Sequence, residues 1–293
     1  MNVTIVGLGL IGGCAGLDLK NEPGIRRTGV DFKPEHGTLA LQLGLVDDLR
    51  PEGETLSDAD VILLAIPVHS IRAMLPQILD VMKPGAVVID FGSTKAAICK
   101  EVAIHPRRSQ YVAAHPLAGT ENSGPAAACT GLFRGKVNIV CERDRSSPDA
   151  IMVAQKVFSI LGLQTIFMEP DDHDRHVAYV SHLSHVSSFL LGQTVLDIEK
   201  DEKNIFNLAG SGFASTVRLA KSSPEMWAPI FEQNAEYLGQ ALAEYIMHLQ
   251  RFHYQLMKRN TRELYRVLQE ANTIRRVLDP AKSITPTFQE HSL

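Results

Sequence analysis

The sequence is poor in the features that mark several classes of protein. It has no run of Lys or Arg and a formal net charge of −4, so we expect no nucleic-acid partner. Its longest apolar run, Val61 to Pro67, is far shorter than the ~20 residues that a membrane helix needs, so we expect no membrane span. No cationic leader precedes the first apolar segment, which argues against a signal peptide. The four cysteines show no CxxC pair and no metal-ligand spacing, so we expect reduced thiols in a cytoplasmic protein.

The first half of the chain alternates short apolar, β-branched runs with stretches of helical character. Such alternation predicts an α/β fold, in which a doubly wound, mostly parallel sheet is covered by helices on both faces. The 293 residues suffice for about two domains, and we place the first at residues 1–169. The expected strands are Asn2–Val6, Thr28–Asp31, Val61–Ile66, Ala86–Asp90, Tyr111–Ala114, Val137–Val140 and Gln164–Phe167.

After residue 169 the strand signals stop. The pattern predicts an all-helical second domain at residues 170–280, followed by an irregular tail at 281–293. Pro229 predicts a kink, or a one-turn helix before it. The apolar stripes of these helices are wider than one chain needs, so we expect a homodimer through the C-terminal helices. The expected helices cover residues 171–200 and 204–208, begin after the Ser cap at 222–223, and run from a cap at Asn260 to about residue 278.

A glycine-rich turn follows the first strand directly. Gly7, Gly9 and Gly12 stand in the spacing GxGxxG between a strand and a helix, and Asp31 ends the next strand at close to the expected separation of ~20 residues. The glycines permit a tight turn, close approach of a diphosphate and close helix packing, while the helix N-terminus attracts phosphate. The acid binds ribose hydroxyls and disfavours a 2′-phosphate, which predicts NAD, although Lys33 softens that preference. The expected cofactor contacts are Gly7, Leu8, Gly9, Leu10, Ile11, Gly12, Asp31, Ser93 and, after the next strand, Ile66 and Pro67.

Two further expected strands end in polar residues. Asp90 is followed by Phe-Gly-Ser-Thr-Lys, which contains Ser93, and Ala114 is followed by His115 at the start of the loop HPLAGTENSG. Ligands of an open α/β sheet bind outside the carboxyl ends of its strands, so both stretches point toward the nicotinamide. A neutral imidazole suits removal of a hydroxyl proton during hydride transfer, and a neighbouring hydroxyl can orient it. His115 with Ser93 is the candidate catalytic pair, although either residue alone also fits a turn or a helix cap.

The expected second domain carries further candidates. His182 and His185 lie one helical turn apart on one face, which suits substrate contact, a metal or buried interdomain histidines. Acidic and histidine residues at 171–176 lie just upstream, but without an HExxH motif or a cysteine ligand we expect no metal. Arg218, in a stretch of small residues, is a surface charge, an interdomain ion pair or a clamp for a carboxylate.

Five motifs lie in order along the chain: GLGLIGG at the start, DFGSTK at 90–95, HPLAGTENSG at 115–124, SHLSH at 181–185 and GFASTVRLAKSSPEMW at 212–227. This order resembles the prephenate/arogenate dehydrogenases of tyrosine biosynthesis, and the resemblance covers nearly the whole chain. It implies a Rossmann domain followed by a helical dimerisation domain.

The resemblance also implies roles for individual residues. His115 would take the proton from the ring hydroxyl of the substrate, and Ser93 would hydrogen-bond the same hydroxyl. Arg218 would bind a substrate carboxylate. The other expected substrate contacts are His182, His185, Thr120, Glu121 and Ser181.

The implied reaction is the NAD-dependent oxidative decarboxylation of prephenate to 4-hydroxyphenylpyruvate. A positively charged pocket with two histidines favours prephenate over arogenate, from which tyrosine would form directly. Another two-domain dehydrogenase, acting on a hydroxy or imino acid, explains the fold but not the later motifs. A non-catalytic NAD-binding sensor leaves His115, Ser93 and Arg218 without a purpose.

Overall fold

The computed structural model describes residues 1–51, 56–202 and 204–278. The chain divides into two compact units, residues 1–239 and 240–293. The boundary predicted at residue 169 separates the sheet from the helices along the sequence. It stays a prediction, because the first helices after residue 169 belong to the same compact unit as the sheet. The predicted tail at 281–293 lies outside the described residues. Within the described ranges, no helix is both long and apolar enough to cross a membrane.

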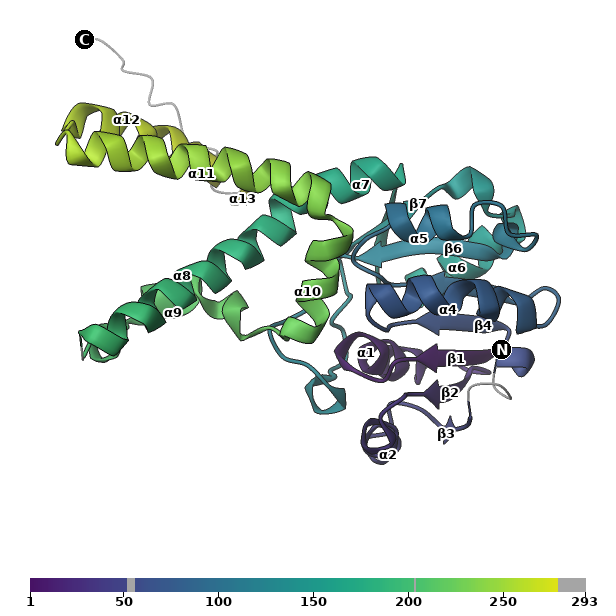
Figure 1. The fold of residues 1–293 in the computed structure, drawn as a ribbon. Helices are drawn as coiled ribbons and strands as arrows, with labels where there is room; N and C mark the ends of the chain where they lie inside the picture. Colours follow the sequence, from purple (N-terminus) through teal and green to yellow (C-terminus); the bar gives the residue numbers. More distant parts are fainter. Residues whose placement is uncertain (52–55, 203, 279–293) are drawn as a thin grey trace, which may run out of the picture. The chain divides into compact units, whose positions relative to one another are not determined.

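The first unit is built on an eight-stranded sheet (Figure 1). Its strand order is β3-β2-β1-β4-β5-β6-β7-β8, and the first six strands are parallel. The order 3-2-1-4-5-6 is that of the doubly wound dinucleotide-binding fold, so the predicted fold class is confirmed. β7 runs antiparallel to β6, and β8 parallel to β7. The strands are β1 (Asn2–Val6), β2 (Arg26–Val30), β3 (Asp48–Leu49), β4 (Val61–Leu64), β5 (Val87–Asp90), β6 (Tyr111–Pro116), β7 (Val137–Cys141) and β8 (Gln164–Met168).

Helices cover both faces of this sheet because alternate strand residues point to opposite sides. Val3 and Ile5 of β1 belong to a core with α1 and α6, whereas Val6 belongs to a core with α4 and α5. Strand residues buried on both sides explain the near-continuous apolar runs of the sequence. The helices between the strands are α1 (Leu10–Leu19), α2 (Pro34–Gln42), α4 (Val68–Val81), α5 (Ala96–Glu101) and α6 (Pro148–Ile160).

The helix expected at residues 171–200 is present, with one irregularity. Its first part, α7 (Pro170–Val177), passes through a π-helical turn at Ala178–His182 into α8 (Leu183–Asp201). A π turn inserts one extra residue into the helical register, and such turns are frequent at functional sites. Here it changes the faces on which the SHLSH residues lie. At 204–208 only a 3₁₀ turn is formed, at Phe206–Leu208, and it is followed by α9 (Ser211–Thr216) and a 3₁₀ turn at Arg218–Lys221.

The behaviour predicted for Pro229 differs from the structure. Helix α10 (Pro224–Gln233) begins after Ser223 as predicted, but it continues through Pro229 instead of ending before it. Proline removes one helical hydrogen bond. Trp227 and Ile230, on either side of it, are buried against α4 and the sheet, and this packing holds the helix together.

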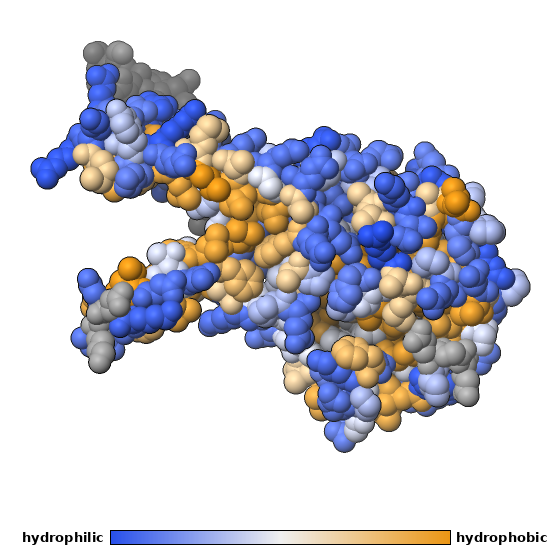
Figure 2. All heavy atoms as spheres, in the orientation of Figure 1, coloured by the Kyte–Doolittle hydropathy of each residue, from blue (hydrophilic) through white to orange (hydrophobic). Residues whose placement is uncertain are grey.

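The C-terminal helices begin with α11 (Ala235–Met257), which starts in the first unit and continues in the second. The predicted cap at Asn260 is confirmed: its side chain accepts a hydrogen bond from the Glu263 N–H at the start of α12 (Thr261–Ala271). A 3₁₀ turn and α13 (Arg275–Leu278) end the described chain. Hydrophobic side chains are exposed along α8 and along α11 (Figure 2).

Candidate functional site

The glycine-rich turn after β1 has the shape that a diphosphate needs. Gly7 has a φ of +92°, and a Cβ on Gly12 would lie 1.9 Å from the Gly7 carbonyl oxygen, so neither position tolerates a side chain. A Cβ on Gly9 would meet nothing within 4 Å, so the backbone there is open to a ligand. Gly9 caps α1 without a side-chain hydrogen bond, so no side chain of the cap occupies the first N–H groups of that helix, which can bind an anion.

Asp31 is held against this turn. Its Oδ2 accepts a hydrogen bond from the Leu8 N–H (2.8 Å) and its Oδ1 accepts one from the Lys33 N–H (2.9 Å). The carboxylate is only 5% exposed, and His36 Nδ1 lies 3.8 Å from it. Ile66, in the short connection between β4 and α4, lies beside Gly7. The structure therefore places Leu8, Asp31 and Ile66, which were predicted to contact the cofactor, beside the glycine-rich turn. Ser93 follows a different strand, β5.

The loop after β5 is anchored by a buried ion pair. Lys95 is fully buried, and its ammonium group donates to Asp90 and to the Ala114 carbonyl oxygen (2.8 Å). Tyr111 donates its hydroxyl proton to the same Asp90. The contact from Lys95 to Ala114 joins the loop after β5, which carries Ser93, to the carboxyl end of β6, which carries His115. No hydrogen bond joins Ser93 to His115 in the parts of the chain that the structure describes.

His115 lies within strand β6 rather than at the start of a loop. The strand was expected to end at Ala114, but pairing with the antiparallel β7, which places His115 opposite Ile139, extends it to Pro116. The partner of its side chain is His173, with Nδ1 2.8 Å from His173 Nε2. Burial, with charge repulsion from His173 and Lys95, holds the pKa of His115 well below its ordinary value. The imidazole is therefore neutral near neutral pH, as a proton acceptor must be.

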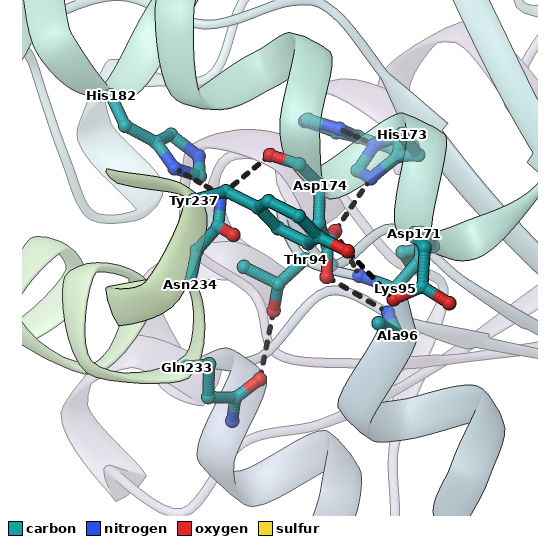
Figure 3. A network of polar contacts seen from close by, with 12 residues as sticks. Thr94, Lys95, Ala96, Asp171, His173, Asp174, His182, Gln233, Asn234 and Tyr237 are labelled. Carbon is teal, nitrogen blue, oxygen red and sulfur yellow. Dashed lines mark hydrogen bonds and ion pairs between the residues drawn. The ribbon is translucent and has the colours of Figure 1, made fainter. Parts of the chain in front are cut away.

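The chain of contacts continues from His173 to Asp174, in a network that Figure 3 shows. His173 Nδ1 lies 2.8 Å from Asp174 Oδ1, and the Asp174 carboxylate accepts hydrogen bonds from the N–H groups of Lys95 and Ala96 (Figure 3). Asn234 donates to the Asp174 carbonyl oxygen and lies 3.0 Å from His182 Nδ1. From the sequence, His173 is a candidate only for a metal site. Its contact with His115 spans 58 residues, and no local pattern signals it.

The rings of His182 and His185 both contact Trp227. The ring of His185 stacks on the indole with centroids 3.5 Å apart, and His182 meets it edge-on at 5.8 Å. Burial lowers the pKa of His182 to about 4, and it also lowers that of His185. Among the described residues, His182 Nε2 and Trp227 Nε1 are buried polar atoms without a hydrogen-bond partner. Ser181 is half-buried, and its carbonyl oxygen contacts His185 Nδ1 at 3.0 Å.

Arg218 reaches the loop that follows β6. Its guanidinium pairs with the Glu121 carboxylate, and the two side chains are 50% and 22% exposed. The pKa of Glu121 is lowered by its own backbone N–H and by Arg218. Thr120 accepts a hydrogen bond from the Asn122 N–H in the same loop. The ion pair thus joins two of the predicted substrate residues. Of the alternatives considered for Arg218, which were a surface charge, an interdomain ion pair and a carboxylate clamp, the structure shows an ion pair, with Glu121. In the described part of the chain, no cluster of three or more His, Cys, Asp or Glu residues could hold a metal.

Comparison with known families matches nearly the whole chain. Residues 15–167 match the family model described as the nucleotide-binding domain of prephenate dehydrogenase, and residues 169–270 match that of its dimerization domain. The prephenate dehydrogenase of Bacillus subtilis is 28% identical over 277 residues, which cover 93% of this chain and 75% of that protein. The cyclohexadienyl dehydrogenase of Zymomonas mobilis is 28% identical over 291 residues, 97% of this chain and 98% of that protein.

Solved structures give the same picture. Aquifex aeolicus prephenate dehydrogenase, in complex with hydroxyphenyl propionate and NAD+, has a TM-score of 0.86 and 29% identity over 95% of this chain and 98% of that chain. Synechocystis arogenate dehydrogenase has a TM-score of 0.74 and 29% identity over 95% of this chain and 100% of that chain. These relatives are about equally similar in sequence, but their names specify different substrates.

Proposed function

Because the chain belongs to the prephenate dehydrogenase family, we propose that it oxidises and decarboxylates prephenate to 4-hydroxyphenylpyruvate in tyrosine biosynthesis, with NAD+ as the hydride acceptor. The observation that carries the proposal is the position of His115. This neutral imidazole lies at the carboxyl edge of the sheet, separated from the glycine-rich turn by two intervening strands, and its printed ring contact among the described residues joins Nδ1, not Nε2, to His173.

His115 acts as the base in this reaction. Its Nε2 takes the proton of the ring hydroxyl while hydride leaves the carbon that bears the oxygen. The bond to the ring carboxylate then breaks, CO₂ leaves, and the electron pair of that bond makes the ring aromatic as a phenolate, whose oxygen takes the proton back from His115. Ser93, from the neighbouring strand end, orients the hydroxyl. Arg218 binds a carboxylate of the substrate by exchanging its contact with Glu121 for one with the ligand.

The glycine-rich turn and Asp31 fit a dinucleotide, whose nicotinamide ring supplies the hydride acceptor when it is bound. The open backbone at Gly9 and the free N–H groups of α1 suit a diphosphate. Asp31 Oδ1 and Oδ2 each use one hydrogen bond on the turn, which leaves acceptor capacity for the ribose hydroxyls. Its negative charge disfavours the phosphate of NADP+.

We expect the change Asp31→Asn to lower the ratio of kcat/KM with NAD+ to that with NADP+ by about tenfold, because it removes the charge that repels the 2′-phosphate. The amide keeps one oxygen for the Leu8 N–H, so the turn is preserved. The ratio is measured from NADH and NADPH formation. The change Asp80→Asn, at an exposed carboxylate on α4, is the control and leaves the ratio as it is. An unaltered ratio in Asp31→Asn would remove this residue from cofactor selection.

The substrate is tested by NADH formation with prephenate and with arogenate. Prephenate carries a keto acid where arogenate carries an amino acid. A positively charged pocket with two histidines was expected, but burial lowers the pKa of both His182 and His185, so both are neutral near neutral pH and the positive charge of the pocket rests on Arg218. We expect prephenate to give the higher kcat/KM. A higher value with arogenate would assign the enzyme to that substrate, and no turnover of either would overturn the proposal.

We also propose that the C-terminal helices form a homodimer, and we expect Leu249→Asp to produce monomers. Leu249 and Leu256 of α11 are 50% and 51% exposed, and Phe252 between them is 36% exposed, so α11 presents an apolar stripe. A second copy would bury this stripe, and a carboxylate within it would then lack a partner. Sedimentation measures the mass of the assembly. The neighbouring change Gln250→Asp, also at an exposed position, should leave the dimer intact. A monomeric wild type would refute the proposal.

A further inference from the structure

The side chains of His115, His173 and Asp174 form a linear chain of contacts whose hydrogens can be assigned. The last member, Asp174, uses both carboxylate oxygens as acceptors: Oδ1 from the Lys95 N–H (2.8 Å) and Oδ2 from the Ala96 N–H (2.9 Å). Asp174 Oδ1 also contacts His173, and a carboxylate has no proton to donate. The contact of 2.8 Å between Asp174 Oδ1 and His173 Nδ1 therefore requires the proton to be on the imidazole nitrogen.

The proton on His173 Nδ1 determines where the proton of His115 lies. Burial lowers the pKa of His173, so near neutral pH its ring has one proton, and that proton is on Nδ1. Nε2 of His173 is then an acceptor. The 2.8 Å contact with His115 Nδ1 is a hydrogen bond only if His115 carries its proton on Nδ1. The remaining nitrogen of His115, Nε2, then has a free lone pair.

We propose that His173 and Asp174 are positioning residues that hold His115 in the tautomer with a basic Nε2 and stabilise the imidazolium that forms when it takes the substrate proton. This inference rests on the function proposed for His115. The proton moves from the substrate oxygen to His115 Nε2, and the Nδ1–H bond to His173 stays intact. The negative charge of Asp174 acts through the polarised ring of His173.

The surroundings make this chain rigid. His173 is fully buried and Asp174 is 2% exposed, so water does not compete for their hydrogen bonds. Asn234, 2% exposed, donates to the Asp174 carbonyl oxygen from the end of α10 (Figure 3). The other charged or titratable groups that act on His115 are Lys95, which is engaged by Asp90, and His182. The wrong tautomer of His115 would place a proton on Nε2 and leave no base.

Two substitutions of His173 in the full-length enzyme test the inference. The change His173→Leu removes the acceptor for His115 Nδ1. We expect kcat to fall by about 10–10²-fold, which is less than the loss expected when the general base itself is removed. KM for prephenate and the Kd of NAD+ should stay within about twofold of wild type. Gln offers an amide oxygen to the same N–H, and we expect His173→Gln to recover kcat to within about fivefold of wild type. A wild-type kcat in His173→Leu, or equal losses in both variants, would overturn the proposal.

The tautomer is also observed without turnover. In wild-type enzyme with ¹⁵N-labelled histidine, NMR distinguishes a protonated ring nitrogen from an unprotonated one, and the spectrum of His115→Asn identifies the His115 signals. We expect His115 to be protonated at Nδ1 and free at Nε2. A proton on Nε2 would overturn the proposal even if His173→Leu does not fold. Because this measurement needs no substrate, it stands apart from the assay that decides whether prephenate is oxidised.

Discussion

Replacing His115 by Asn lowers kcat by about 10²–10⁴-fold, the usual contribution of a general base, and leaves the affinity for NAD+ unchanged. The asparagine amide can still donate to His173 Nε2, so the buried contact of 2.8 Å is kept while the basic nitrogen is lost. Two strands, β4 and β5, separate the residue from the glycine-rich turn, which explains why cofactor binding is spared. Turnover is measured as NADH formation at saturating substrate, and NAD+ binding by titration.

The matched control is His176→Asn. This histidine lies on α7, close in sequence to His173, but it is exposed. We expect the His176→Asn enzyme to have the kcat of wild type. The acid limb of the wild-type pH profile gives a second check. Because burial lowers the pKa of His115, its base form persists as the pH falls, and kcat/KM should decline only below the ordinary range of histidine. Near-normal turnover of His115→Asn would exclude His115 as the base.

Replacing Arg218 by Gln raises KM for prephenate by about 10–10²-fold and changes kcat much less. A guanidinium binds a carboxylate through two parallel hydrogen bonds, which a neutral amide does not reproduce. The Arg218 side chain is 50% exposed, so solvent screens the interaction and the loss is smaller than for a fully buried pair. Steady-state kinetics with varied prephenate separate KM from kcat.

The control for Arg218 is Arg72→Gln on α4. Arg72 is 53% exposed and also pairs with a glutamate, Glu101, so its environment resembles that of Arg218. It lies outside the proposed pocket, and we expect its loss to leave KM unchanged. An equal KM in wild type and Arg218→Gln would show that the pair with Glu121 is only a surface contact.

Much of the fold was predictable because local patterns encode it. Apolar runs predicted seven strands of the sheet; in the central strands, such as β4 and β5, residues buried on both faces leave no polar alternation. The turn from Gly7 to Gly12 was predictable because its backbone geometry restricts which residues can stand there. Caps such as Asn260 were readable because their hydrogen bonds join residues three positions apart.

Other features depend on contacts that local patterns do not contain. The two-residue strand β3 is too short to show periodicity, and the extension of β6 through His115 depends on pairing with β7, which starts more than 20 residues later. The continuity of α10 through Pro229 depends on the burial of Trp227 and Ile230. Local propensity predicts none of these three features, because tertiary packing overrides it.

The sequence by itself determined the doubly wound sheet, the dinucleotide turn and the identity of His115 as the candidate base. Those conclusions follow from backbone requirements and motif order, which are properties of neighbouring residues. Only the tertiary structure decided what surrounds the base. The contact of His115 with His173, the neutral state of His182 and the pairing of Arg218 with Glu121 all arise where distant segments meet in a buried or half-buried site. Burial and long-range hydrogen bonds set these properties, and both exist only after the chain has folded.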